Sequence, residues 1–364
     1  MTNRSLLSPR KMCRSMARTS SSMMGACVGL AFVGLATVGL ACSGGGSMSG
    51  TGGASGTGTG GTTGGGAAAP YKPCADAQKI GAFTLDLKHA DAATSNPAYS
   101  QVNGGVRDGV RPDSIWVESP VTGAANGCKL MVGPMNACTP ACSGTQVCKA
   151  GTCQAAPVTK SVGEVTLTGL VVPVKMTPSN ISGNVVYTGS IPSSTTYPPY
   201  TVGDALGLMA AGADYPAFSL TGKGIDPLEP AANQTLNVAK DQPLTIKWVA
   251  PSAGGKGRIE LIMDIAHHGG VSAEIHCDLE DTGSVTIPAA LITALMDKGT
   301  FGFPTVSVTR VSADSMTVGP GCVEFNVAAG LELPLNVAGV VSCNDDTGCT
   351  APQHCIIPGY KCGT

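Results

Sequence analysis

The sequence predicts an all-β protein that is stapled by disulfides and preceded by a disordered leader and tether. Glycine (50 residues) and proline (25) are abundant among the 364 residues, whereas charged residues make up 13% and aromatic residues 4%. This composition favours short strands joined by turns over helices. Many short stretches alternate apolar and polar residues with a period of two, which is the pattern of half-buried strands. The sequence also contains clusters of cysteines. A core that is poor in aromatic rings is therefore expected to rely on disulfide cross-links.

Residues 1–41 are expected to be a signal peptide that is removed on export. Basic residues precede an apolar stretch from Met23 to Ala41, and a small residue stands directly before Cys42. The segment 38–43 resembles a bacterial lipobox, in which the cysteine is acylated and becomes the new N-terminus, although Gly39 occupies the place where leucine is preferred. The resemblance implies lipid attachment at Cys42, and Ser43 implies sorting to the outer membrane. Ordinary secretion and a retained N-terminal anchor are the alternatives.

Residues 42–70 are expected to form a tether, because Cys42 is followed by a tract of glycine, serine and threonine with nothing to bury. A flexible coil of this length reaches about 30 Å, which holds a folded body clear of lipid headgroups. The segment 56–61 matches the dinucleotide pattern G-x-G-x-x-G. Neither a strand nor a helix flanks it, so composition alone explains the match.

The charge balance argues against nucleic acid as a partner. The leader contains five basic residues and no acidic one, so the mature chain keeps 17 basic against 24 acidic residues, a net charge of −7. Nucleic-acid binding needs clustered lysine and arginine, and the sequence has no such cluster.

Twelve cysteines remain outside the leader and the lipobox, and in an exported chain they predict a disulfide framework. They are Cys74 and Cys128, the quartet Cys138, Cys142, Cys148 and Cys153, then Cys277 and Cys322, and the quartet Cys343, Cys349, Cys355 and Cys362. The quartets look like two copies of one module, and they lack the paired hooks of zinc ribbons, so disulfides are favoured over structural zinc. Each quartet is expected to close within itself, with three connectivities open. Elimination then joins Cys74 to Cys128 and Cys277 to Cys322.

Three segments follow the tether. Residues 71–157 are expected to hold a small β unit with the first cysteine module, residues 158–340 an antiparallel, Ig-like β-sandwich, and residues 341–364 the second module. Strands 258–266 and 271–279 are expected to pair as a hairpin. One short helix is expected over 288–296, where proline suits the first turn. The clearest alternating runs are Phe83, Leu85 and Leu87, then Leu244, Ile246 and Trp248, then Ile259, Leu261 and Met263, and Val323, Phe325 and Val327.

The order of several loose motifs resembles a group of uncharacterised myxobacterial-type secreted lipoproteins over most of residues 71–340. These motifs are the segments 163–170 and 212–218, the strand with Trp248, and the segments 275–278, 281–284 and 308–310. The resemblance implies the same exported architecture and brings no activity with it.

The segment Asp281-Thr282-Gly283-Ser284 matches the D-T-G-S motif of aspartic proteases. That chemistry needs two aspartates that share a proton, each from its own loop. The other D-T-G, beginning at Asp346, lies inside the C-terminal cysteine quartet. The motif is therefore interpreted as a solvated polar turn, and no catalytic residue is assigned.

Five possible metal ligands lie within a short stretch: Asp264, His267, His268, Glu274 and His276. Imidazole and carboxylate so close together could bind a transition metal. However, the segment 267–270 looks like the tip of the hairpin, and Asp264, Glu274 and His276 then alternate onto its polar face. Exposed polar residues are the expected outcome there.

These features favour a non-enzymatic binding or structural module of the cell envelope, anchored through its lipid and needing no cofactor. Expected partners are the membrane and a polysaccharide or protein of the envelope. The aromatic loop from Tyr197 to Tyr200 is the one stretch that suggests a contact surface. The alternative is a secreted hydrolase or metal-dependent enzyme of unfamiliar type, which a deep cleft with convergent carboxylates or histidines would favour.

Overall fold

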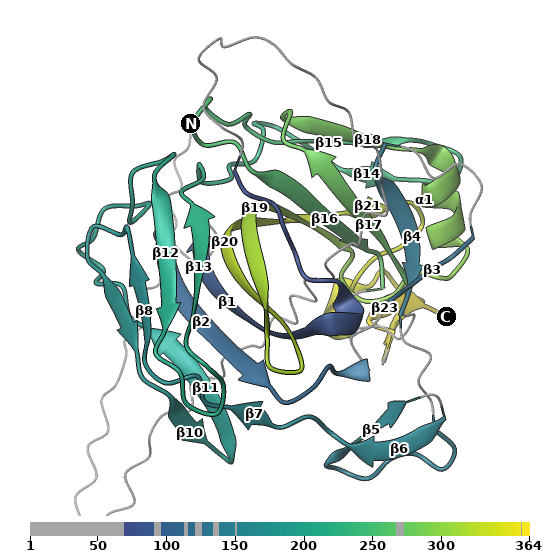
Figure 1. The fold of residues 1–364 in the computed structure, drawn as a ribbon. Helices are drawn as coiled ribbons and strands as arrows, with labels where there is room; N and C mark the ends of the chain where they lie inside the picture. Colours follow the sequence, from purple (N-terminus) through teal and green to yellow (C-terminus); the bar gives the residue numbers. More distant parts are fainter. Residues whose placement is uncertain are drawn as a thin grey trace, which may run out of the picture. The chain divides into compact units, whose positions relative to one another are not determined.

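The computed structural model describes residues 69–90, 96–112, 116–120, 126–133, 138–149, 151–266, 273–357 and 359–364 (Figure 1). The predicted signal peptide, the predicted lipid site at Cys42 and nearly all of the tether lie outside these ranges. Within them, no helix combines the length and the apolar character that crossing a membrane requires.

One 11-stranded sheet organises the fold, and the prediction of an all-β protein is confirmed. Its strands lie in the order β10-β11-β2-β1-β20-β19-β16-β17-β4-β3, and β7 also pairs with β2. All pairings in this sheet are antiparallel except that of β1 with β20, so the sheet is mixed. The bounds are β1 Lys79–Lys88, β2 Tyr99–Arg107, β3 Val117–Glu118, β4 Cys128–Val132, β7 Thr159–Lys160, β10 Ser179–Ile181, β11 Asn184–Gly189, β16 Arg258–Asp264, β17 Ala273–Glu280, β19 Thr305–Val318 and β20 Gly321–Pro334.

This sheet takes strands from both sides of position 157. β1, β2, β3 and β4 come from the segment in which a small β unit is expected, whereas β16, β17, β19 and β20 come from the expected sandwich. The expected hairpin of β16 and β17 forms, with Leu261 opposite Cys277.

Smaller elements pack on one face of the large sheet (Figure 1). A four-stranded antiparallel sheet has the order β13-β12-β8-β9, and its strand β13 contacts β19 and β20. The expected helix is α1, which contacts β17 and β4. The bounds are β8 Val165–Thr168, β9 Val174–Met176, β12 Ala205–Ala210, β13 Phe218–Lys223, β14 Asn237–Val238, β15 Leu244–Lys247, β18 Ser284–Ile287, α1 Ala289–Met296 and β21 Asn336–Val337.

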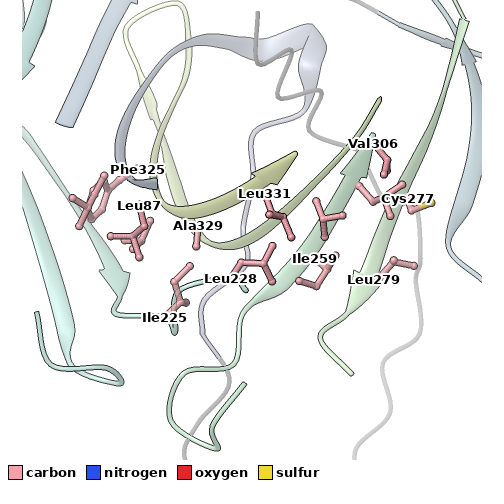
Figure 2. Close-up of a cluster of buried hydrophobic side chains, with 14 of the residues drawn as sticks. Leu87, Ile225, Leu228, Ile259, Cys277, Leu279, Val306, Phe325, Ala329 and Leu331 are labelled. Carbon is pink, nitrogen blue, oxygen red and sulfur yellow. The ribbon is translucent and has the colours of Figure 1, made fainter. Parts of the chain in front are cut away.

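The core lies between these layers because each strand turns its alternate apolar residues to the same face. Phe83 and Leu85 of β1 stand beside Phe325 and Val327 of β20, and all four are fully buried. Figure 2 shows part of this core, in which inward side chains of β1, β16, β17, β19 and β20 gather with Ile225 and Leu228. The alternating runs read from the sequence therefore point inward as predicted.

A segment that we name the strap, residues 70–78, crosses the sheet on the face opposite the core. Tyr71 bridges Ala313 in β19, where the Ala313 amide donates to the Pro70 carbonyl at 2.8 Å. After the short 3₁₀ turn Asp76–Gln78 the chain enters β1, which lies on the far side of β20. Because β19 and β20 are neighbours, the strap spans both strands. The Cys74–Cys322 disulfide fastens it to β20.

The six disulfides confirm the framework and correct the long-range pairing. Cys74 bonds Cys322, and Cys128 bonds Cys277, so the expected Cys74–Cys128 and Cys277–Cys322 pairs are wrong. The reason is the strand order: β4 lies beside β17, which sets Cys128 directly opposite Cys277. Elimination along the sequence cannot see which strands become neighbours.

The two cysteine quartets close within themselves, as predicted, and they have the same connectivity. In each, the first cysteine bonds the third and the second bonds the fourth: Cys138–Cys148, Cys142–Cys153, Cys343–Cys355 and Cys349–Cys362. Each module contains a hairpin, of β5 (Gln146–Lys149) with β6 (Thr152–Ala155) and of β22 (His354–Ile356) with β23 (Lys361–Gly363). In each module, the backbone N–H of a glutamine donates to the backbone carbonyl three residues earlier, from Gln146 to Ser143 and from Gln353 to Thr350. The modules are thus structurally equivalent.

Candidate functional site

The D-T-G-S segment holds a buried ion pair. Asp281 follows the end of β17, and its side chain turns into the core-facing layer, where Arg310 of β19 donates through Nε to Oδ2 at 2.6 Å. Asp281 is 3% exposed and Arg310 is 1% exposed. The expectation of a solvated turn is therefore wrong for Asp281, although Thr282 and the following turn reach the surface.

Both carboxylate oxygens of Asp281 have further partners. The indole of Trp248 donates to Oδ1 at 2.9 Å, and a second nitrogen of Arg310 donates to the same oxygen at 3.3 Å. Arg310 also donates to three backbone carbonyls, those of Asp226, Pro227 and Val249. A carboxylate bound in this way anchors two loops to the sheet. Among the hydrogen bonds of the described residues, none joins it to a second aspartate, which the chemistry of an aspartic protease requires.

Among the described residues, the possible metal ligands do not form a group of three or more ligand atoms. His267 and His268 lie outside the described ranges. Asp264 accepts a hydrogen bond from the Ala266 amide at 2.7 Å, whereas Glu274 lies against His276, with 2.6 Å between Oε2 and Nε2.

His276 is 1% exposed, so the expected exposed polar face is wrong at this position. The ring of Trp116 covers it, with 5.2 Å between the ring centroids. Within the described ranges, the groups whose ligand atoms are close enough to hold an ion are three cysteines of each quartet, and all of them form disulfides.

A charged cluster under the strap was not found from the sequence. Glu324 of β20 is 1% exposed and points to the face opposite the core. Its Oε1 accepts a hydrogen bond from the Cys74 amide at 2.7 Å. Its Oε2 lies 2.5 Å from Nζ of Lys79 and accepts a hydrogen bond from Nδ2 of Asn326 at 3.1 Å. The sequence signal was weak, because Glu324 and Asn326 fall in the polar phase of a strand and only the sheet order brings Lys79 to them.

A second carboxylate, Glu260 of β16, lies beside this cluster. The Tyr71 hydroxyl donates to its Oε1 at 3.2 Å. Burial raises the pKa of the Glu260 carboxyl to about 7, because desolvation outweighs the hydrogen bond from Tyr71 and the attraction of Lys79. Burial also raises the pKa of the Tyr71 hydroxyl well above its usual range. Arg258 lies over the Tyr71 ring, 5.7 Å from its centroid.

The aromatic loop 197–200 packs against the body more than it faces solvent. Tyr200 is buried and its hydroxyl donates to the Ile225 carbonyl at 2.9 Å. Tyr197 is half-buried and packs against the core. The loop therefore contributes to stability, and its second tyrosine is not a contact surface.

The chain matches no family model and no curated protein. Among solved structures it is similar to chicken CNTN1, in a crystal structure of the FN1–FN3 domains. The two are 9% identical, the likeness covers 64% of this chain and 68% of that chain, and the TM-score is 0.18. A TM-score of this size does not support an argument about function, so the fold rests on the strand arrangement described above.

Proposed function

We propose that this chain is an exported, lipid-anchored module of the cell envelope with a non-enzymatic binding or structural role. The observation that carries the proposal is the strap. The first described residues after the tether pair with the central strand β19 and are disulfide-bonded to β20. A tether joined in this way would connect the anchor to the middle of the sheet. Unfolding that starts at the N-terminal end of the described chain is then resisted by the two central strands, β19 and β20.

The buried polar groups support a structural role as well. Asp281, which has the sequence of a catalytic loop, is committed to Arg310 and Trp248. Six disulfides suit an oxidising compartment, where a thin core gains from covalent staples. The net charge of −7 that the chain would carry after the predicted cleavage favours a polysaccharide or a protein of the envelope over nucleic acid as partner.

The test uses the purified mature chain. We expect it to co-sediment with isolated envelope polysaccharide, or to cross-link to an envelope protein in intact cells, without chemical change to either partner. In parallel, the chain is incubated with unstructured polypeptide from acid to neutral pH, and no cleavage is expected. Cleavage that the Asp281→Asn variant abolishes would overturn the proposal, because it would assign catalysis to the D-T-G-S segment.

A further inference from the structure

Three side chains under the strap form a reactive arrangement that a simple ion pair does not require. Lys79 begins β1, while Glu324 and Asn326 lie two residues apart on the parallel neighbour β20. The Lys79 amine and the Asn326 amide nitrogen both lie within hydrogen-bond range of one atom, Glu324 Oε2, at 2.5 and 3.1 Å. An amine and a side-chain amide thus share one carboxylate oxygen as their hydrogen-bond partner.

The backbone directs Lys79 to this point through a bulge. Along β1, Phe83 and Gly81 face the core, so strict alternation would turn Lys79 inward as well. The register instead shifts between Lys79 and Gly81, so that Lys79 lies opposite Cys322 and its side chain reaches the outer face. Bulges commonly re-aim a side chain in this way, and they are maintained where the new direction matters.

The surroundings limit water at the cluster. Glu324 is 1% exposed, and the Cys74 amide of the strap holds its other oxygen at 2.7 Å. The side chain of Lys79 is 23% exposed. The ion pair of Lys79 and Glu324 is therefore largely shielded from bulk water.

We propose that Lys79 and Asn326 form an intramolecular isopeptide bond, with Glu324 as the catalytic residue. Glu324 accepts a proton from the Lys79 ammonium, and the free amine attacks Cγ of Asn326. The Nζ–Cγ bond forms, the Cγ–Nδ2 bond breaks, and Nδ2 leaves as ammonia after Glu324 returns its proton. Of the two protons left on Nζ, one stays on the new amide and the other leaves with the ammonia as ammonium. No oxidant or other co-reactant is needed, because the reaction exchanges one amide for another.

The bond would join the start of β1, opposite Cys322, to the middle of β20. Unlike that disulfide, it would survive reducing agents. A chain pulled through its tether would then be held by two covalent links to β20, of which one is independent of redox state. The site itself does not depend on whether the chain is lipid-anchored, so its test is independent of the proposed function.

The experiment is an intact-mass measurement on the folded, exported protein after complete reduction and alkylation of its cysteines. We expect a mass lower by one molecule of ammonia than the sequence requires. A tryptic digest is expected to contain one branched peptide that joins the Lys79 and Asn326 peptides. The variants Lys79→Arg, Asn326→Ser and Glu324→Gln are each expected to restore the full mass.

The matched control is Lys72→Arg, since Lys72 lies on the strap near the cluster but donates to the Ser315 carbonyl and not to Glu324. This variant should keep the loss of ammonia and the branched peptide. Ammonia loss from an Asn-Gly cyclisation, as at Asn126, would persist in Lys79→Arg and give no branched peptide. Full mass in the folded wild-type protein, or ammonia loss without the branched peptide, would overturn the proposal in favour of a plain ion pair.

Discussion

At the scale of single residues, the buried ion pair of Asp281 and Arg310 shows how a charge is retained inside a mostly apolar layer. Arg310 donates hydrogen bonds to one carboxylate and three backbone carbonyls, so its whole guanidinium has hydrogen-bond partners. Such a pair is weak evidence for net stability, but removing one partner is costly because it leaves the other charge buried and unpaired.

We therefore expect Asp281→Ala to lower the free energy of unfolding by about 3–5 kcal/mol. Denaturant titration under non-reducing conditions measures this change in the free energy of unfolding. Thr282→Ala, in the exposed part of the same turn, is the matched control and should stay within about 0.5 kcal/mol of the wild type. Joint replacement of Asp281 and Arg310 by leucine and methionine should recover much of the loss, and failure to recover any would contradict the ion-pair explanation.

Glu260 leads to a prediction about pH. Its pKa is about 7 in the folded chain and 4.5 in its ordinary environment, so the folded state holds the extra proton between these values. The contribution of Glu260 to stability is fully present below pH 4.5 and is lost as the pH rises to about 7. Glu260→Gln cannot ionise, so the difference in unfolding midpoint between variant and wild type should move in favour of the variant across this window. Glu332→Gln, at an exposed position of β20, should show no such trend.

The sequence predicts buried apolar residues well and buried polar residues poorly. Alternation correctly placed Phe83, Leu85 and Phe325 in the core, because apolar residues are inward wherever one face of a strand is covered. The same rule sent His276 to solvent. The rule fails at His276 because Trp116, which is distant in sequence, covers this residue on the face of the sheet opposite the core. Glu324 escaped notice for the same reason, since the strap that covers it comes from the other end of the chain.

At the scale of elements, the strap depends on a disulfide whose partners are 248 residues apart in sequence. A cross-link that closes so long a loop constrains the unfolded chain strongly. Composition and spacing could predict the number of disulfides and the closure of each quartet. They could not predict the two long-range pairs, because these follow from β1 lying beside β20 and β4 beside β17.

Replacing both Cys74 and Cys322 by serine should cost about 2–5 kcal/mol of stability, the usual loss for a native disulfide. It should also release the strap, so the Lys72 amide, which donates to the Ala313 carbonyl, should exchange its hydrogen faster. Replacing Cys349 and Cys362, in the C-terminal module, should leave this exchange unchanged. A non-reducing peptide map that joins Cys74 to Cys128 would contradict the pairing on which the prediction rests.

At the scale of the whole molecule, the first described segment is joined to the two central strands of the large sheet. The strap pairs with β19, and the Cys74–Cys322 bond and the inferred Lys79–Asn326 bond both lead to β20. The two equivalent cysteine modules lie outside the large sheet, each stabilised by its own pair of disulfides.

If the N-terminal side is attached to a membrane, the strap and its disulfide would join that anchor to the middle of the sheet, and this gives the last prediction. We expect cleavage before Cys42 and lipid on its thiol and new amino group, so the mature protein should fractionate with membranes. Two or more acyl chains bind a bilayer far more firmly than one, which makes retention resistant to washing. The Cys42→Ser variant should appear in the soluble or secreted fraction with its body still folded. Cys27→Ser, which changes the other cysteine of the apolar stretch, should be retained like the wild type. Unchanged membrane retention of Cys42→Ser would show that the attachment is not through this cysteine, and the strap would then need another explanation.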